Sequence, residues 1–163
     1  MRRRSLTAAA ALAAAAALVA ASPPPRGWNS YMSTGGAVDE ATLLRVADYV
    51  AQHLAPFGYT LLILDEGWSE AAGAMVLDAY GRPYPSEAAY PSAAGGRGFA
   101  PLSAQLASKG LQLGLWVLRG VPRSAAAAAT PIWQSNFSCD QAVRFDRPCF
   151  WNGLTYGVRV GAA

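Results

Sequence analysis

Apolar residues recur every three or four positions between Asp39 and Pro56, which predicts a helix with one buried face. Asp39 can cap the start of this helix, and Pro56 with Gly58 ends it. The single histidine, His53, falls at the edge of the apolar face, so we interpret it as a surface residue rather than a ligand. The apolar face consists of Leu43, Val46, Ala47, Val50, Ala51 and Leu54.

Two continuous apolar runs, at residues 59–64 and 111–118, predict strands of a parallel sheet, where both faces are buried. A second, short helix carrying Leu102, Gln105 and Leu106 precedes the later run. The connection between the first run and this helix, residues 67–99, is rich in Gly, Pro, Ser and Tyr. Connections in α/β units usually have about 2–6 residues, so its length suggests a functional loop.

If the segment around Trp28 is the first strand, the chain reads strand, helix, strand, helix, strand. This order predicts an α/β fold, namely about the first three βα units of a (β/α)8 TIM barrel. A whole barrel takes about 250 residues, and this chain has 163. We therefore expect an incomplete barrel domain over residues 22–123 and an irregular tail over 124–163, where an alanine run begins.

The first 21 residues predict a cleaved signal peptide. Arg2-Arg3-Arg4 precedes an apolar block at residues 8–19, which is short for a membrane span of about 20 residues. We expect a secreted, vacuolar or cell-wall protein without a membrane anchor after cleavage. A plastid transit peptide is the alternative, because the segment contains Arg, Ser and Thr and no acid. On the secretory route, Asn136 in Asn136-Phe137-Ser138 is a potential N-glycosylation site.

Charge and cysteine content exclude several kinds of site. The net charge is +3 and falls to about zero without the three leading arginines, so nucleic acid is not an expected partner. The chain has no Cys/His cluster, phosphate loop or dinucleotide fingerprint, which predicts no metal and no cofactor. Cys139 and Cys149 form either a disulfide or two separate thiols, and the sequence favours neither.

Candidate chemistry lies where the first apolar run ends, at Asp65-Glu66, followed by Trp68. In βα barrels the functional residues lie at the carboxyl ends of strands. Carboxylates can accept hydrogen bonds from sugar hydroxyls, while an indole covers the apolar face of a sugar ring. The alternative is that the two acids cap a helix or belong to a solvated loop.

Five motifs in this order resemble the α-galactosidase (melibiase) family of retaining glycoside hydrolases. They are Pro24-Pro25-Arg26-Gly27-Trp28-Asn29-Ser30-Tyr31; Gly58-Tyr59 with Leu64-Asp65-Glu66-Gly67-Trp68; Asp78-Ala79-Tyr80-Gly81-Arg82-Pro83; Tyr90-Pro91 with Gly95-Gly96-Arg97-Gly98-Phe99; and Ser108-Lys109-Gly110-Leu111-Gln112-Leu113-Gly114-Leu115. The resemblance covers residues 24 to about 120 and therefore implies the N-terminal part of such an enzyme.

Further segments are similar to a plant-type, α-galactosidase-like branch of that family. These are the Pro-Pro-Arg opening, residues 95–98, Arg119-Gly120-Val121-Pro122, Thr130-Pro131-Ile132 and Cys149-Phe150-Trp151. The branch implies a related substrate such as a β-L-arabinopyranoside, whose ring is galactose without the hydroxymethyl arm. The family's usual second-strand motif is Asp-Asp-Gly-Trp, and Glu66 replaces its second Asp.

The resemblance also implies roles for particular residues. Trp28 would line the floor of the sugar pocket, Trp68 and Trp116 would wall it, and Asp65 and Glu66 would accept hydrogen bonds from the hydroxyls of a terminal galactose-like sugar. The expected reaction is hydrolysis of terminal α-D-galactosyl residues by retaining double displacement, which needs no cofactor.

The catalytic pair is not expected within this chain. In the family it comprises two aspartates on later strands, one of them in a Lys-x-Asp motif, and the only lysine here is Lys109 on the second helix. Asp140 and Asp146 follow no apolar strand. Asp65 and Glu66 are adjacent and so point to opposite sides of an extended chain. We expect downstream coding sequence to supply the pair; the alternative is a non-catalytic, secreted, sugar-binding remnant.

Overall fold

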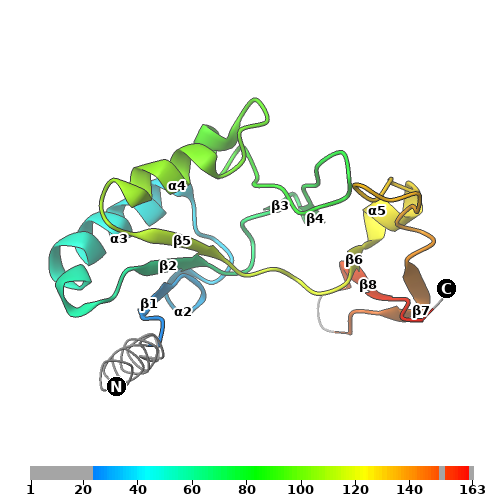
Figure 1. The fold of residues 1–163 in the computed structure, drawn as a ribbon, viewed down its shortest axis with the longest axis horizontal. Coiled ribbons are helices and arrows are strands. Elements are labelled where there is room, and N and C mark those ends of the chain that lie inside the picture. The colour runs from blue at the N-terminus through cyan, green and yellow to red at the C-terminus, as the bar shows by residue number, and fades with distance from the viewer. Residues whose placement is uncertain (1–23, 151–152, 162–163) are drawn as a thin grey trace, which may run out of the picture.

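The computed structural model describes residues 24–150 and 153–161. Figure 1 shows a larger lobe of parallel strands and helices and a smaller lobe with an antiparallel sheet, joined by extended chain. The predicted signal peptide and Trp151 lie outside the described residues. Within the described part of the chain, no helix is long and apolar enough to cross a membrane.

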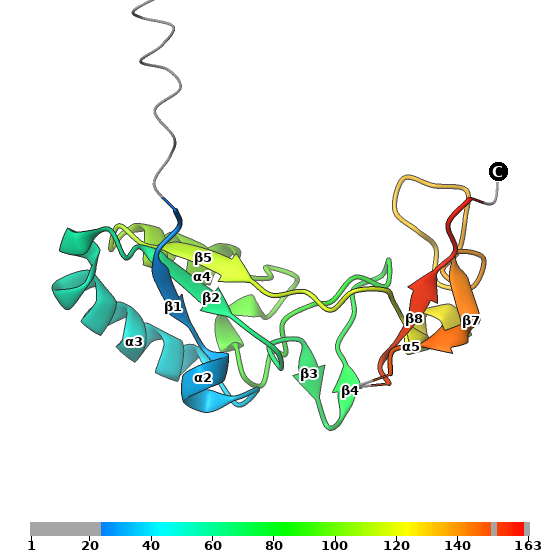
Figure 2. The ribbon, with the colours of Figure 1, turned by 90° about the horizontal axis from the view of Figure 1, so that it is seen from below.

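The larger lobe is built on three parallel strands in the order β1-β2-β5. They are β1 (Gly27–Asn29), β2 (Leu61–Leu64) and β5 (Gln112–Leu115), with Trp28 opposite Leu62 and Ile63 opposite Gly114. Two helices, α3 (Glu40–His53) and α4 (Ala100–Ala107), cover one face of this sheet (Figures 1 and 2). The predicted order of strands and helices and the α/β class are confirmed, and the sheet is open rather than closed into a barrel.

Helix α3 begins and ends as its sequence predicts. The Asp39 carboxylate accepts a hydrogen bond of 2.7 Å from the backbone N–H of Thr42, which satisfies one free donor of the first turn. The apolar face turns toward the sheet, and His53 is exposed at the last turn. A short 3-10 helix, η1 (Ala55–Phe57), and Gly58 with a positive φ of 84° end the helix.

The core of the larger lobe lies between the sheet and its two helices. Leu62 and Leu64 of β2 are fully buried there, and the Tyr90 hydroxyl donates to the backbone oxygen of Val38 at 2.8 Å. Leu61 and Ile63 point to the other face and are only half-buried. The expectation of burial on both faces is thus wrong for β2, because the helices cover one side only. The fully buried side chains packed with β2 are Leu43, Ala47, Tyr90, Ala93, Leu102 and Leu106.

Short elements occupy the connections. Helix α2 (Tyr31–Thr34) follows β1 directly. The predicted long loop contains the hairpin β3 (Glu70–Ala71) and β4 (Ala74–Met75), and then the 3-10 helix η2 (Pro91–Ala93).

The smaller lobe contradicts the expectation of an irregular tail over 124–163. It contains β6 (Val121–Pro122), α5 (Arg123–Ala127), β7 (Val143–Pro148) and β8 (Thr155–Val158), and its sheet is antiparallel in the order β6-β8-β7. The strands escaped detection because β7 buries only Val143 and otherwise exposes its side chains, so it has neither an apolar run nor alternation. The alanine run forms α5, with Ala125 and Ala126 buried.

Candidate functional site

The candidate site lies at the carboxyl end of the parallel sheet, on the face that the helices leave uncovered. The register pairs Asn29 with Ile63, and Asp65 lies two residues beyond Ile63, so the three share this face. The side-chain amide Nδ2 of Asn29 donates to Oδ2 of Asp65 at 2.7 Å. Oδ1 of Asn29 in turn accepts from the backbone N–H of Tyr31 at 2.9 Å, which fixes the orientation of the amide.

Buried Ser30 fixes the backbone of the same acid. Its Oγ accepts a hydrogen bond of 2.9 Å from the backbone N–H of Asp65, and its own N–H donates to the Ile63 oxygen at 3.0 Å. The second carboxylate oxygen of Asp65, Oδ1, accepts from the N–H of Glu66 at 2.8 Å. The carboxylate is therefore held in one orientation before any ligand arrives, which is what precise recognition of a polar ligand requires.

Glu70 extends the acidic character of this region. Its carboxyl is partly buried, which raises its pKa above the usual value, and the nearby charge of Glu66 raises the pKa further. Gly67 lies between the acids with φ 98°, and a Cβ there would stand 2.1 Å from the oxygen of Gly36. Only glycine fits this turn, which sets the direction of the chain beyond Asp65 and Glu66. No group of His, Cys, Asp or Glu in the described ranges could hold a metal ion.

Trp28, which the resemblance assigned to the floor of the sugar pocket, lies on the face of the sheet opposite to Asp65. It pairs with Leu62 in the sheet, on the helix-covered face, and packs against the core. Its Nε1 donates to Oγ of Ser33 at 3.2 Å, and its ring borders a hollow beside Val46 and Tyr49 of α3. Trp28 and Asp65 thus lie on opposite faces of the sheet, and the role of Trp28 in a sugar pocket stays a prediction.

The side chain of Trp68 is buried in the core of the larger lobe. It is 5% exposed, its ring lies 5.4 Å from that of Phe99, and its Nε1 donates to the backbone oxygen of Trp116 at 2.7 Å. The indole is thus held within the core, and its role as a wall of a sugar pocket stays a prediction. Trp116 follows β5, donates its N–H to Leu64 at 2.8 Å and is half-buried. It borders a hollow of about 10 Å³ together with Trp68 and Glu70, too small for more than about one water.

Sequence reasoning missed Asn29, Ser30 and Glu70. The first two belong to the Gly-Trp-Asn-Ser motif, and pairing the two predicted strands in parallel register would have placed Asn29 beside Asp65. The position of Glu70 depends on the turn at Gly67. The only sequence signal for this turn is the glycine itself.

The remaining predicted residues lie in the smaller lobe. Asn136 is exposed in the loop before Cys139, as an acceptor of a glycan must be. Cys139 is buried, which raises the pKa of its thiol, and Cys149 is half-buried. The two cysteines carry thiols in this structure, and their pairing stays a prediction. Figure 1 shows the smaller lobe, which carries these residues, lying apart from the carboxyl ends of β1, β2 and β5.

An anchored carboxylate at the carboxyl end of a parallel βα sheet is the arrangement of barrel enzymes that bind polar substrates. No protein-family model and no curated protein matches this sequence. Solved structures do match. A candidate α-N-acetylgalactosaminidase from Bacillus halodurans C-125 is 34% identical, with a TM-score of 0.81 over 86% of this chain and 34% of that chain.

A family 27 β-L-arabinopyranosidase from Geobacillus stearothermophilus is 35% identical, with a TM-score of 0.81 over 85% of this chain and 34% of the enzyme. A variant of that enzyme in complex with arabinose has a TM-score of 0.80. The chain thus spans about a third of the length of these proteins. These similar structures are glycoside hydrolases of the α-galactosidase type, as the sequence resemblance predicted, and the chain is similar to part of them.

Proposed function

We propose that this chain forms the sugar-binding strand ends of a glycoside hydrolase of the α-galactosidase type. The observation that carries the proposal is the Asp65 carboxylate, held by Asn29 and by the N–H of Glu66 at the carboxyl end of β2. The reaction would be hydrolysis of a terminal α-D-galactosyl residue with retention of configuration.

Asp65 and Glu66 would bind the hydroxyls of the sugar. A carboxylate that already accepts two hydrogen bonds still has free lone pairs for hydroxyl donors, because each carboxylate has about four acceptor positions. Hydrogen bonds to charged groups contribute about 1.5–3 kcal/mol each. Since Asp65 is already oriented, little conformational entropy is lost when the sugar binds.

The catalytic pair would come from polypeptide beyond this chain. Retaining glycosidases need two carboxyl groups about 5–5.5 Å apart. Asp146 lies on the antiparallel strand β7, where its carboxylate pairs with Arg144 at 2.8 Å, and Asp140 lies in a loop of the smaller lobe. Neither follows a strand of the parallel sheet. This chain covers 34% of each matched enzyme, which leaves room for the missing strands in the rest of such an enzyme.

A β-L-arabinopyranoside is the second candidate substrate. The favouring observations are the similarity to an enzyme named for that sugar and the Glu at position 66 where α-galactosidases usually have Asp. The side chain of Glu66 is longer than that of Asp and would leave less space for the hydroxymethyl group of galactose. Arabinopyranose lacks this group.

The test measures binding and hydrolysis separately, with the full chain. We expect methyl α-D-galactoside or L-arabinose to bind in calorimetric titration, and Asp65→Asn to weaken binding about tenfold by weakening a charged hydrogen bond. Glu87→Gln is the matched control, since Glu87 is an exposed acid outside the site. Equal affinity of the Asp65→Asn and unmodified chains would refute the proposal.

Hydrolysis assays with aryl α-galactoside and aryl β-L-arabinopyranoside then distinguish the two candidate substrates. We expect no turnover by this chain alone, and turnover once the missing barrel strands are supplied. Turnover by the chain alone would place the catalytic pair within it and contradict our assignment. Binding that never leads to turnover would support the sugar-binding remnant.

We propose, in addition, that the protein follows the secretory route. The exposed position of Asn136 supports this. In secreting eukaryotic cells, enzymatic deglycosylation should increase the gel mobility of the chain and leave Asn136→Gln unchanged. Delivery to plastids would leave both forms unmodified.

A further inference from the structure

A hollow in the smaller lobe lies away from Asp65. Its volume is about 570 Å³, within the range of about 300–1,000 Å³ typical of small-molecule pockets. The lining residues are Ile132, Ser135, Phe137, Asp140, Gln141, Ala142 and Arg159. Figures 1 and 2 show this lobe beyond the β3-β4 hairpin, at the far end from β1, β2 and β5.

Backbone hydrogen bonds hold the walls of the hollow in place. The N–H of Ile132 donates to the oxygen of Phe137 at 3.0 Å, which closes the loop on one side. The N–H of Arg159 donates to the oxygen of Ala142 at 2.8 Å, which fixes the opposite wall to the end of β8. The N–H of Ser138 donates to Oε1 of Gln141 at 3.0 Å. The hollow is therefore a feature of the fold rather than of side-chain rotamers alone.

Polar groups that the fold does not use converge there. Ser138 Oγ donates to Oδ1 of Asp140 at 2.5 Å, while Oδ2 has no hydrogen-bond partner among the described residues. The guanidinium of Arg159 and the side-chain NH₂ of Gln141 likewise have no hydrogen-bond partner among the described residues. One wall thus offers a charged acceptor and the others two kinds of donor.

An aromatic ring supplies the apolar surface. Phe137 is 63% exposed and lines the hollow, so its ring is accessible to a ligand there. A pyranose has one apolar face formed by C–H groups and an edge of hydroxyls that both donate and accept. A stacking ring, an acceptor and donors around one hollow match this ligand. A simple anion would be repelled by the Asp140 carboxylate.

We propose that this hollow is a second carbohydrate-binding site, which takes a neutral pyranose unit of an oligosaccharide. The sugar ring stacks on Phe137, its hydroxyls donate to Asp140 Oδ2, and Arg159 and Gln141 donate to its oxygens. The site goes beyond the proposed hydrolase function and does not depend on Asp65.

The test uses the full, unglycosylated chain carrying Asp65→Asn, so that sugar binding at the candidate site around Asp65 is weakened. Raffinose and D-galactose serve as probes in saturation-transfer NMR and calorimetric titration. We expect saturable binding in this background, and about tenfold weaker binding when either Phe137→Ala or Asp140→Asn is added. Both positions lie on exposed or loop surface, so folding should persist, as circular dichroism can verify.

Asn136→Gln is the matched control, because Asn136 is adjacent to Phe137 but does not line the hollow. It should leave the affinity unchanged. The proposal is overturned if the Asp65→Asn chain binds neither sugar, or if Phe137→Ala and Asp140→Asn bind as well as it does. It is equally overturned if inorganic phosphate binds through Arg159 and the sugars do not. If the site around Asp65 binds no sugar, the outcome differs: the unmodified chain and the Asp65→Asn chain should then bind equally well.

Discussion

The two lobes are stabilised in different ways. In the larger lobe, two helices cover a parallel sheet, and one continuous core joins residues from Val38 to Leu111. In the smaller lobe, β7 buries a single side chain and the strands contact each other mainly through surface pairs, such as Phe145 with Tyr156 at 5.2 Å between ring centroids. The difference indicates that the larger lobe carries most of the hydrophobic stabilisation, while the smaller lobe relies on pairing and packing around α5.

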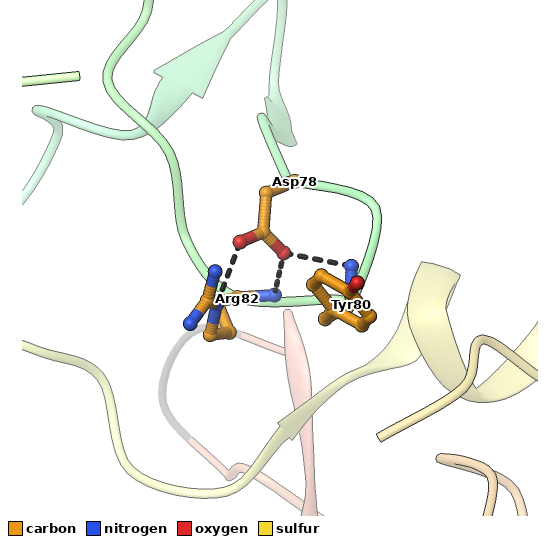
Figure 3. A network of polar contacts seen from close by, with 3 residues as sticks. All are labelled: Asp78, Tyr80 and Arg82. Carbon is orange, nitrogen blue, oxygen red and sulfur yellow. Dashed lines mark hydrogen bonds and ion pairs between the residues drawn. The ribbon is translucent and has the colours of Figure 1, made fainter. Parts of the chain in front are cut away.

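The loop at residues 78–82 packs against the smaller lobe. Gly81 is buried against Ala125 of α5, and the Arg82 guanidinium lies near the rings of both Tyr80 and Trp133, at 5.5 and 5.3 Å from their centroids. Figure 3 shows how Asp78 shapes this loop, with its carboxylate accepting from the N–H groups of Tyr80 and Arg82 and from Arg82 Nε.

The largest effect is expected from Leu62→Ala, which opens a cavity at the centre of the larger lobe. Truncation of a fully buried leucine costs about 2–5 kcal/mol of unfolding free energy. Hydrogen exchange read by mass spectrometry should show lost protection in β2 and β5 and retained protection in β7 and β8. Val143→Ala is the converse control in the smaller lobe. Equal loss of protection in both lobes would show that they unfold as one unit.

The second effect concerns the turn that carries the acids. Gly67→Ala brings a Cβ to 2.1 Å from the Gly36 oxygen at a positive φ, and should cost on the order of 3 kcal/mol. Gly95→Ala is the control, because it has positive φ but nothing within 4 Å of the new Cβ, and should cost about 1 kcal/mol. Denaturant titration of both variants checks the difference. Similar midpoints would mean that the Gly36–Gly67 contact can open easily.

The third effect tests the loop at residues 78–82. Asp78→Ala removes the acceptor of three hydrogen bonds and should cost about 1–3 kcal/mol. Burial acts to raise the pKa of Asp78, but hydrogen bonds from Arg82 and Tyr80 and the Arg82 charge outweigh it, so the pKa is lowered. The contribution is therefore present above the unfolded pKa of 3.8 and is lost as pH falls through the folded value. Melting curves near pH 7 should separate the variant from the unmodified chain, whereas curves at about pH 2 should not.

The smallest effect is expected from Glu70→Gln. Burial first, and then the Glu66 charge, raises the pKa of Glu70 above 4.5, so its ionised form opposes folding. The favourable contribution is present below 4.5 and is lost as pH rises through the folded pKa. The variant should therefore melt about 1–3 °C higher at about pH 7 and no higher at about pH 4. A lower melting temperature at about pH 7 would mean that Glu70 is stabilised by contacts other than those considered.

The sequence predicted the larger lobe better than the smaller one, for a physical reason. Helix α3 follows from its helical periodicity and strand β2 from a short apolar run, because both elements bury side chains in the core of the larger lobe. The smaller lobe depends on pairing between strands with charged, exposed side chains, as in β7, which leaves no periodic signal. At the site, Asp65 was found from its place after a strand, but its partner Asn29 is 36 residues away and depends on register. The resemblance implied that Trp28 and Trp68 contact the sugar, but a sequence motif does not reveal that both rings pack against the core.

The order of the parallel strands has a consequence for synthesis. The strands lie in space in the order in which the ribosome makes them, β1, then β2, then β5. Each new strand therefore meets an edge that is already complete, and no early strand must wait for a distant partner before it can pair. Domains fold from the N-terminus as the chain emerges, so the parallel sheet of this lobe can form strand by strand during synthesis.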